Sequence, residues 1–342
     1  MTTALTWSRT EDAREWDEFV TRNHGSVFHQ WAWRQVIEPE HPRSLYLACR
    51  NQSGRMVAAC PFFYKEGRHF MYLDSLPDSL MAGPVIDESE EDMSRIVDSM
   101  RKSVKSLKLM AMRVRVHQKE TIRILESMKF RHDAVTSGLL MLDLRSNTPE
   151  FIWNNCFQKH DRRAVKSYEK ENAVFEFAER DSDYSDYLAL DSGTTWEGDE
   201  DMGLLASRLS RMRKYFAERF RLAIVTLGGE AAVGLPLLLD DTISTIHAVK
   251  GIRYSSAKNI HEPMANSTFV DWKIANWGSE HGFRYVDFGS YPIGAVSNPK
   301  HVFCDLKGRF GLTLVPWYRF TLPTSDIFPI ARQVSRLVRG AR

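Results

Sequence analysis

The sequence lacks the features that mark several large classes of protein. It contains no run of about 18 apolar residues, so we expect no membrane-spanning helix. Its four cysteines form no C-x-x-C pair and lie far apart, which excludes a disulfide scaffold and a zinc site. The net charge is only +2, which excludes a highly basic nucleic-acid packaging protein. No signal peptide is visible in Met1–Arg14, and we expect a soluble protein of a reducing compartment, the cytoplasm.

The motifs of several common enzyme classes do not occur either. The chain has no G-x-x-x-x-G-K-[ST] or G-x-G-x-x-G loop, no G-x-S-x-G elbow and no H-E-x-x-H pair. Asp287-Phe288-Gly289 is like the kinase metal-binding triplet, but no other kinase motif accompanies it. The 11 histidines are dispersed, so we predict no metal site and no permanently bound cofactor.

What the sequence does contain is an alternation of helix-like and strand-like segments, with a weak internal repeat. A shift of about 175 residues superposes two hairpins, with Gly54 on Gly229 and Pro61 on Pro236. Because proline is rare inside strands, its recurrence at the same offset favours a duplication over two unrelated hairpins. The 342 residues then divide into two related α/β domains, 1–146 and 147–342, the second with a basic C-terminal segment.

Two segments of the second half have the composition of a binding site. Residues 159–166 open a predicted helix on which Arg162, Lys166 and Lys170 recur every fourth residue, as a cationic stripe for phosphate or carboxylate groups or as a solvated face. A polar loop with His261 and Glu262 precedes a second helix and is a candidate substrate or anion cradle.

A third segment, near the last strand, combines charge with apolar surroundings. Lys307 and Arg309 lie among apolar residues, with Gly308 and Gly311 allowing close backbone approach. A partly desolvated lysine would stabilise a developing oxyanion, although an ordinary surface turn is the alternative.

Taken in order, these motifs resemble those of the FemAB-like peptidyltransferases, which belong to the GNAT-like acyltransferases. The resemblance covers nearly the whole chain and includes Gly83-Pro84 in the first half. It implies an α/β fold of two tandem GNAT-like domains, each a mixed sheet flanked by helices, in the short form without the helical arm. The matching stretches in the second half are Arg162-Arg163, Glu262-Pro263-Met264, Asp287-Phe288-Gly289 and Leu306-Lys307-Gly308-Arg309-Phe310-Gly311.

The resemblance implies an enzyme of cell wall biogenesis, an acyl or aminoacyl transferase that forms an amide bond on an amine of a peptidoglycan-type or polysaccharide precursor. Lys307 matches the lysine of the family, and Asp287 and Gly289 match its D-F-G turn. We predict that Lys307 stabilises the oxyanion, and that Asp287 or a substrate carboxylate assists deprotonation of the amine. The predicted substrate-binding residues are Arg162, Arg163, Lys166, His261, Glu262, Gly289 and Arg309.

The acyl donor stays open between aminoacyl-tRNA and acyl-CoA. The missing arm argues against tRNA, and the lack of an R/Q-x-x-G-x-A/G loop argues against conventional acetyl-CoA use. Basic segments at 101–119 and 332–342 would contact tRNA phosphates or an anionic membrane surface, or are solvated helix faces. Two alternatives remain, a non-catalytic GNAT-fold binding module for envelope intermediates and an acyl-CoA-dependent sugar N-acyltransferase.

Overall fold

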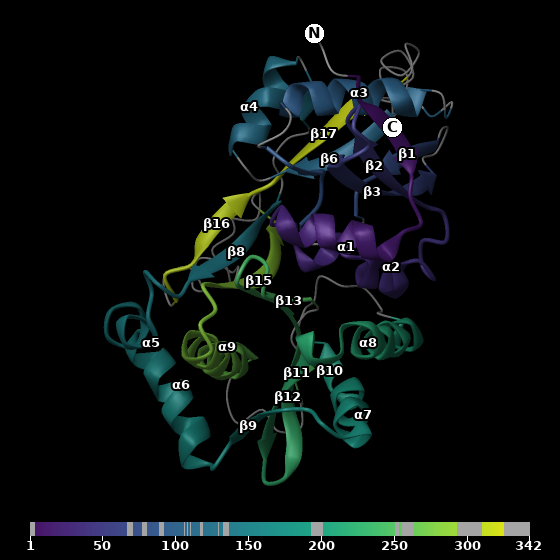
Figure 1. The fold of residues 1–342 in the computed structure, drawn as a ribbon. Helices are drawn as coiled ribbons and strands as arrows, with labels where there is room; N and C mark the ends of the chain where they lie inside the picture. Colours follow the sequence, from purple (N-terminus) through teal and green to yellow (C-terminus); the bar gives the residue numbers. More distant parts are fainter. Residues whose placement is uncertain are drawn as a thin grey trace, which may run out of the picture. The chain divides into compact units, whose positions relative to one another are not determined.

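The structure is a computed structural model. The chain divides into two compact units, residues 1–135 with 316–342 and residues 136–315, each built on its own sheet (Figure 1). The residues that the structure describes are 4–66, 71–76, 81–88, 92–105, 107, 109, 111–116, 119–128, 130–132, 137–192, 201–249, 253–254, 263–292 and 310–324.

The first unit contains a mixed sheet in which β4 and β6 are parallel and the other described neighbours are antiparallel. The strand β5 (Val85–Ile86) pairs with β3 beside this main path. The main order is β1 (Thr6–Arg9), β2 (Ser44–Arg50), β3 (Met56–Glu66), β4 (Met71–Asp74), β6 (Ala111–Val116), β17 (Tyr318–Pro323) and β7 (Arg131–His132).

Helices cover both faces of this sheet (Figure 1). On one face α3 (Met93–Lys105) and α4 (Lys119–Ser127) pack into a core with Met112 and Val114 of β6. On the other face lie α1 (Ala13–Arg22), a 3₁₀ turn (Val27–His29) and α2 (Trp31–Ile37). Helix α1 begins where the Asp12 carboxylate accepts a hydrogen bond from the Glu15 amide, and it buries Trp16, Phe19 and Val20, the face that its periodicity predicts.

The second unit has the same sheet plan. Strands β13 and β15 are its parallel pair, and β14 (Arg253–Tyr254) lies beside β12 and β10 (Asp191–Ser192). The main order is β9 (Val174–Phe177), β11 (Phe220–Leu227), β12 (Glu230–Asp240), β13 (Thr245–Ala248), β15 (Tyr285–Pro292), β8 (Ser137–Asp143) and β16 (Thr313–Pro316).

One face of the second sheet packs against α6 (Lys159–Lys170) and α9 (Pro263–Glu280), where Tyr168 stacks on Phe269 with ring centroids 4.7 Å apart. The short helix α5 (Pro149–Phe151) leads into a π-helical turn (Ile152–Cys156), and Thr148 caps α5 as predicted. On the other side lie α7 (Asp181–Ala189) and α8 (Met202–Phe216), which ends in a 3₁₀ turn (Ala217–Arg219).

The proline of each hairpin occupies the same position in both sheets. Pro61 on β3 pairs with Tyr46 of β2, and Pro236 on β12 pairs with Leu222 of β11. On the edge away from the hairpin partner, β3 pairs with β5 before the proline and with β4 after it, and β12 pairs in the same way with β14 and then β13. The proline, which has no N–H, therefore lies between two strand partners, where no continuous ladder of hydrogen bonds needs a donor. The matching strand orders and prolines confirm the internal repeat.

The two units exchange their last central strand. Strand β8 follows the first unit in sequence but pairs with β15 in the second sheet. Strand β17 follows the second unit but pairs with β6 in the first sheet. The boundary predicted at residues 146–147 falls just after β8, whereas in the structure β8 belongs to the second unit and β17 to the first.

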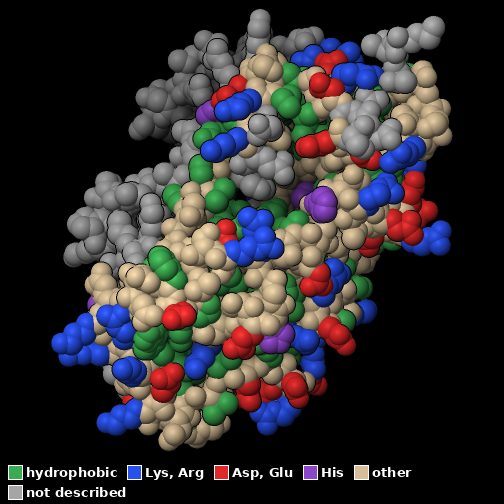
Figure 2. Space-filling model, turned by 60° about the vertical axis from the view of Figure 1, so that its left-hand side comes forward, with side chains coloured by type: hydrophobic (Ala, Val, Ile, Leu, Met, Phe, Trp, Pro, Cys, Tyr) green, Lys and Arg blue, Asp and Glu red, His purple; other side chains and the backbone are tan. Residues whose placement is uncertain are grey.

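Figure 2 shows basic and acidic side chains interspersed over the described part of one face of the molecule. Among the described residues, no helix combines the length and the apolar character that crossing a membrane requires.

Candidate functional site

The predicted site residues fall into three groups. Asp287 and Gly289 lie on β15, in the second sheet. Arg162, Arg163 and Lys166 lie on α6. The remaining predicted residues lie outside the described residues, and they are His261, Glu262, Lys307 and Arg309.

Asp287 is held in a fully buried ionic cluster. His247 on β13 lies beside it in the parallel register, with 3.0 Å between His247 Nδ1 and Asp287 Oδ2. On the other side of the imidazole, His247 Nε2 lies 3.6 Å from Asp240 Oδ2, at the end of β12. The side chains of all three residues are at most 1% exposed, so two carboxylates flank one imidazole away from solvent.

The environment of His247 favours the imidazolium form. Burial alone would lower the pKa of His247, but the neighbouring carboxylates of Asp240 and Asp287 raise it to about 9. This environment favours a charged ring at neutral pH, and the cluster has the order acidic, basic, acidic.

The second oxygen of Asp287 shapes the backbone that follows it. Asp287 Oδ1 accepts a hydrogen bond of 2.9 Å from the Gly289 amide. Gly289 has φ +96°, and the register between β15 and β8 shifts between Asp287 and Ser290, as in a β-bulge. The predicted D-F-G turn is thus a bulge within a strand, which Asp287 holds from the inside.

The cationic side chains of α6 lie on the opposite side of the second sheet from the Asp287 side chain. Val286 packs into the core that α6 and α9 share, so the next residue, Asp287, points the other way. Arg163 and Lys166 are exposed, whereas Arg162 is half-buried and donates a hydrogen bond of 2.8 Å to the Trp153 carbonyl. The structure therefore does not bring the α6 stripe and the Asp287 carboxylate to one cavity.

An aromatic cluster connects α6 with the segment that precedes β16. The Trp153 ring lies 5.5 Å from the Trp272 ring, and the Phe157 ring lies 5.0 Å from the ring of Phe310. Phe310 is fully buried and directly follows Arg309, and its ring centroid is 6.3 Å from that of Phe288. The described backbone beside this cluster thus carries Arg162 and Asp287.

The first unit offers an internal comparison, because the prolines align the two sheets. Two residues after the proline, Phe63 pairs with Asp74 in the first sheet and Leu238 pairs with His247 in the second. Asp74 of β4 and His247 of β13 are therefore equivalent positions.

The charges at equivalent positions are reversed between the units. In the register of the parallel strands, Asp74 lies opposite Arg113 in the first sheet, as His247 lies opposite Asp287 in the second. Four residues after the proline, Lys65 on β3 is equivalent to Asp240 on β12. The first unit thus has the order basic, acidic, basic where the second has acidic, basic, acidic.

The basic segment predicted at 101–119 does not form one surface. Arg101 and Lys102 lie on α3 and pair with Asp98. Arg113 and Arg115 alternate with core residues of β6 and therefore point to the face of the sheet opposite α3. The other basic segment, 332–342, lies outside the described residues.

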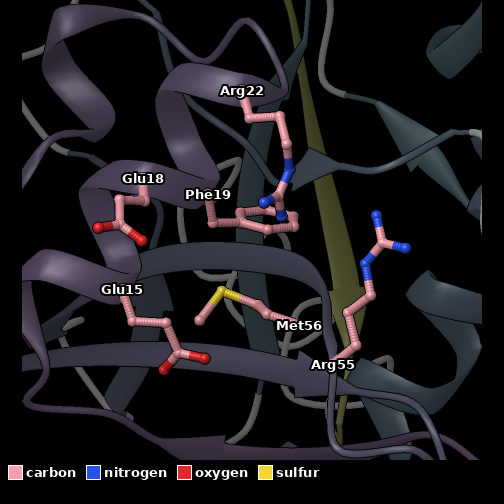
Figure 3. A pocket seen from close by; sticks show the side chains of 6 residues that line it. All are labelled: Glu15, Glu18, Phe19, Arg22, Arg55 and Met56. Carbon is pink, nitrogen blue, oxygen red and sulfur yellow. The ribbon is translucent and has the colours of Figure 1, made fainter.

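A separate pocket of about 330 Å³ opens on the first unit, between α1 and the start of β3. Figure 3 shows Glu15 and Glu18 on one side of Phe19 and Met56, and Arg22 and Arg55 on the other. Several of these charges are already compensated, since Glu15 pairs with Arg50 and Arg55 pairs with Asp87. The pocket lacks a dominant sign of charge and does not identify a ligand.

Sequence reasoning missed His247 and Asp240. The sequence feature that could have identified them is the histidine within the predicted strand at 242–249. Burying an imidazole without a hydrogen-bond partner costs free energy, so a histidine there indicates a polar partner. Its partner Asp287 lies 40 positions further along the chain, and only the parallel pairing of β13 with β15 identifies it.

Comparisons with known proteins agree on the fold. No protein-family profile matches the chain, and no curated protein matches it in sequence. The crystal structure of FemX is similar over 95% of this chain and 99% of its own, with a TM-score of 0.71 and 13% identity. L-PGS from Bacillus licheniformis matches over 96% and 98%, with a TM-score of 0.59 and 13% identity.

A third similar structure is a tandem GNAT protein from the clavulanic acid biosynthesis pathway, with a TM-score of 0.54 and 10% identity over 94% of this chain and 99% of that one. Identities this low establish the fold and leave the activity open. The chain is therefore a mixed α/β protein of two tandem GNAT-like domains, a fold that it shares with FemX and with the tandem GNAT protein.

Proposed function

We propose that this protein is an acyl or aminoacyl transferase that forms an amide bond on an amine of a cell-envelope precursor. The observation that carries the proposal is the position of Asp287. In a fold similar to that of FemX, it lies at the end of the parallel strand pair of the second unit and holds the bulge at Gly289.

The amine attacks the carbonyl of the donor ester or thioester, and the tRNA hydroxyl or the CoA thiol leaves with a proton as the amide bond forms. This chemistry requires a proton acceptor for the amine and a positive or N–H group facing the tetrahedral oxyanion. We assign the second task to Lys307, whose segment leads into the buried Phe310 of the aromatic cluster. Both oxygens of Asp287 are engaged, by His247 and by the Gly289 amide, and the side chain is buried. We therefore assign Asp287 to positioning, and proton acceptance to a carboxylate of the substrate.

The donor and the remaining predicted site residues follow from the same proposal. We propose aminoacyl-tRNA or acyl-CoA as the donor, with Arg162, Arg163, Lys166, His261, Glu262 and Arg309 as substrate-binding residues and a peripheral contact with tRNA or an anionic membrane surface. Arg163 and Lys166 are exposed on α6, on the opposite side of the second sheet from the Asp287 side chain, so we assign them to an anionic part of the substrate remote from the reacting amine.

A transfer assay tests the proposal. The protein is given labelled aminoacyl-tRNA or acyl-CoA together with a UDP-linked muropeptide or an amino sugar, and amide product is measured. We expect Lys307→Ala to abolish transfer while the protein stays folded. The matched control is Lys214→Ala, an exposed lysine on α8.

Undiminished transfer by Lys307→Ala would remove the assigned role of that residue. Binding of precursors without transfer from either donor class would instead identify a non-catalytic binding module. Transfer to an amino sugar from acyl-CoA alone would identify the sugar N-acyltransferase alternative.

A further inference from the structure

The outer face of α6 carries four basic side chains in one line. Lys159, Arg163, Lys166 and Lys170 follow one another at intervals of four, three and four residues, and all four are exposed. Residues at this spacing lie on one face of a helix, so the four charges form a line about 16 Å long. We call these four residues the docking stripe.

The docking stripe faces away from the second sheet. The buried residues of α6 are Asp161, Val165 and Tyr168, and each of them follows a stripe residue by two positions, a rotation of about 200° around the helix. The buried face packs into the core that α6 shares with α9, and α6 lies along the outside of the second unit (Figure 1). The four charges therefore project from the surface of this unit.

The charge of the docking stripe is not neutralised by the described part of the chain. Within that part, none of the four side chains forms an ion pair or a hydrogen bond. Glu169, an acidic residue beside the stripe, is engaged by Lys273 of α9, with 3.7 Å between Nζ and Oε1. Like charges four residues apart destabilise a helix, and the stripe contains two such pairs. The stripe is therefore unfavourable for α6 unless an external anion lies against it.

Exposed apolar side chains lie at both ends of α6. Phe151, 43% exposed, ends α5 just before the π-helical turn that leads to α6, and Val174, 51% exposed, begins β9 just after α6. In the described part of the chain only two other large apolar side chains are exposed, Leu107 and Leu204. An RNA backbone would contact the charges and gain little from Phe151 and Val174, whereas a lipid interface accommodates both kinds of side chain.

We propose that the outer face of α6, with Phe151 and Val174 at its ends, docks onto the surface of an anionic lipid bilayer. The negative potential of such a surface attracts basic side chains, and a straight line of charges on a convex helix meets a flat surface along its whole length. This proposal rests on the proposed function in one respect. It takes the anionic part of the substrate that Arg163 and Lys166 face to be the membrane that holds the precursor.

Sedimentation of the protein with vesicles tests the docking and needs neither an acyl donor nor an acceptor. We expect binding to vesicles of mixed phosphatidylserine and phosphatidylcholine, weaker binding as salt is added, and none to pure phosphatidylcholine. The double variant Lys159→Gln/Lys170→Gln should bind roughly 30-fold more weakly, about fivefold for each charge. This variant leaves Arg163 and Lys166, the stripe residues assigned to the substrate, unchanged.

Two further variants separate the docking stripe from charge in general. The matched control is Arg14→Gln/Lys214→Gln, which removes two charges from exposed positions outside α6 and should bind as tightly as the unchanged protein. Phe151→Ala should weaken vesicle binding several-fold, because less apolar surface enters the interface. Thermal unfolding checks that each variant is folded.

Three results would overturn the proposal. The first is binding to anionic vesicles that is no tighter than binding to neutral ones. The second is an equal loss of affinity in Lys159→Gln/Lys170→Gln and in its control. The third is binding of tRNA that this variant loses, without vesicle binding, because the stripe would then be a site for RNA.

The docking and the transfer reaction can fail separately. Amide transfer by a protein that binds no vesicles would overturn the docking and leave the proposed function intact. Vesicle binding that depends on the docking stripe, without transfer from either donor class, would support the docking and remove the transferase.

Discussion

The imidazole of His247 and the carboxylate of Asp287 form a buried ion pair across the parallel strands β13 and β15, with 3.0 Å between Nδ1 and Oδ2. The pair links the end of one strand to the bulge of the next, because Asp287 also accepts the Gly289 amide. Its strength therefore affects both the stability of the second unit and the shape of the candidate active site.

Replacing His247 should be severely destabilising. His247→Gln would leave Asp240 and Asp287 buried without the cation between them, and breaking a buried ion pair in this way costs about 3–5 kcal/mol. Urea denaturation measures the change in the free energy of unfolding. The control is His281→Gln, an exposed histidine just after α9, which loses one hydrogen bond to the Trp277 carbonyl and should cost only about 1 kcal/mol.

The same cluster predicts how stability depends on pH. The pKa of His247 is raised in the folded protein to about 9 from an ordinary value of 6.5, so the folded state holds the proton more tightly. Its contribution is complete below about pH 6.5 and is lost as the pH rises through about 9. The unfolding free energy should decline over this window by denaturant titration, and a variant lacking His247 should decline less. If the unfolding free energy falls with pH equally steeply in the unchanged protein and in the variant lacking His247, the raised pKa of His247 is contradicted.

Asp271 on α9 should limit stability at neutral and alkaline pH. Burial raises the pKa of this carboxyl to about 8, so the folded state disfavours the ionised form. Stability is therefore lost as the pH rises from about 4 towards 8. Asp271→Asn should raise the free energy of unfolding at pH 8 by more than about 1 kcal/mol. The control Asp186→Asn, at an exposed position of α7, should leave the free energy of unfolding unchanged at pH 8. If Asp271→Asn instead lowers the free energy of unfolding, the ionised Asp271 carboxylate has a stabilising partner.

Replacing Gly289 and, as a control, Gly282 distinguishes the cost of backbone strain from a role of Gly289 in the candidate site. It has φ +96°, and Gly282 has φ +79° with nothing within 4 Å of the position that a Cβ atom would occupy. Replacing either glycine with alanine should cost about 1–2 kcal/mol, because both would hold a side chain in a left-handed conformation. Only Gly289→Ala should also lower amide transfer, since it alone disturbs the bulge that Asp287 holds. Equal transfer by the two variants at a temperature where both are folded would remove Gly289 from the site.

The sequence predicts the features that depend on local pattern. The buried face of α1 follows from the spacing of Trp16, Phe19 and Val20, and the duplication follows from Pro61 and Pro236. The contacts that the sequence did not predict depend on pairing between distant strands. The parallel register that joins His247 to Asp287 is of this kind, because alternation within one strand says nothing about which strand lies beside it.

The strand exchange has a consequence that can be measured far from the site. Phe320 on β17 is fully buried in the core of the first unit, although most of that unit lies more than 180 positions earlier in the chain. Phe320→Ala should cost about 3–5 kcal/mol, because it opens a cavity in that core. Amide hydrogen exchange should become faster in β6, which pairs with β17, while the second sheet keeps its protection. Phe151→Ala, at a position that is 43% exposed in the second unit, is the matched control. Faster amide hydrogen exchange in β15, with unchanged hydrogen exchange in β6, would place β17 in the second sheet. That result would contradict the exchange of strands between the two units.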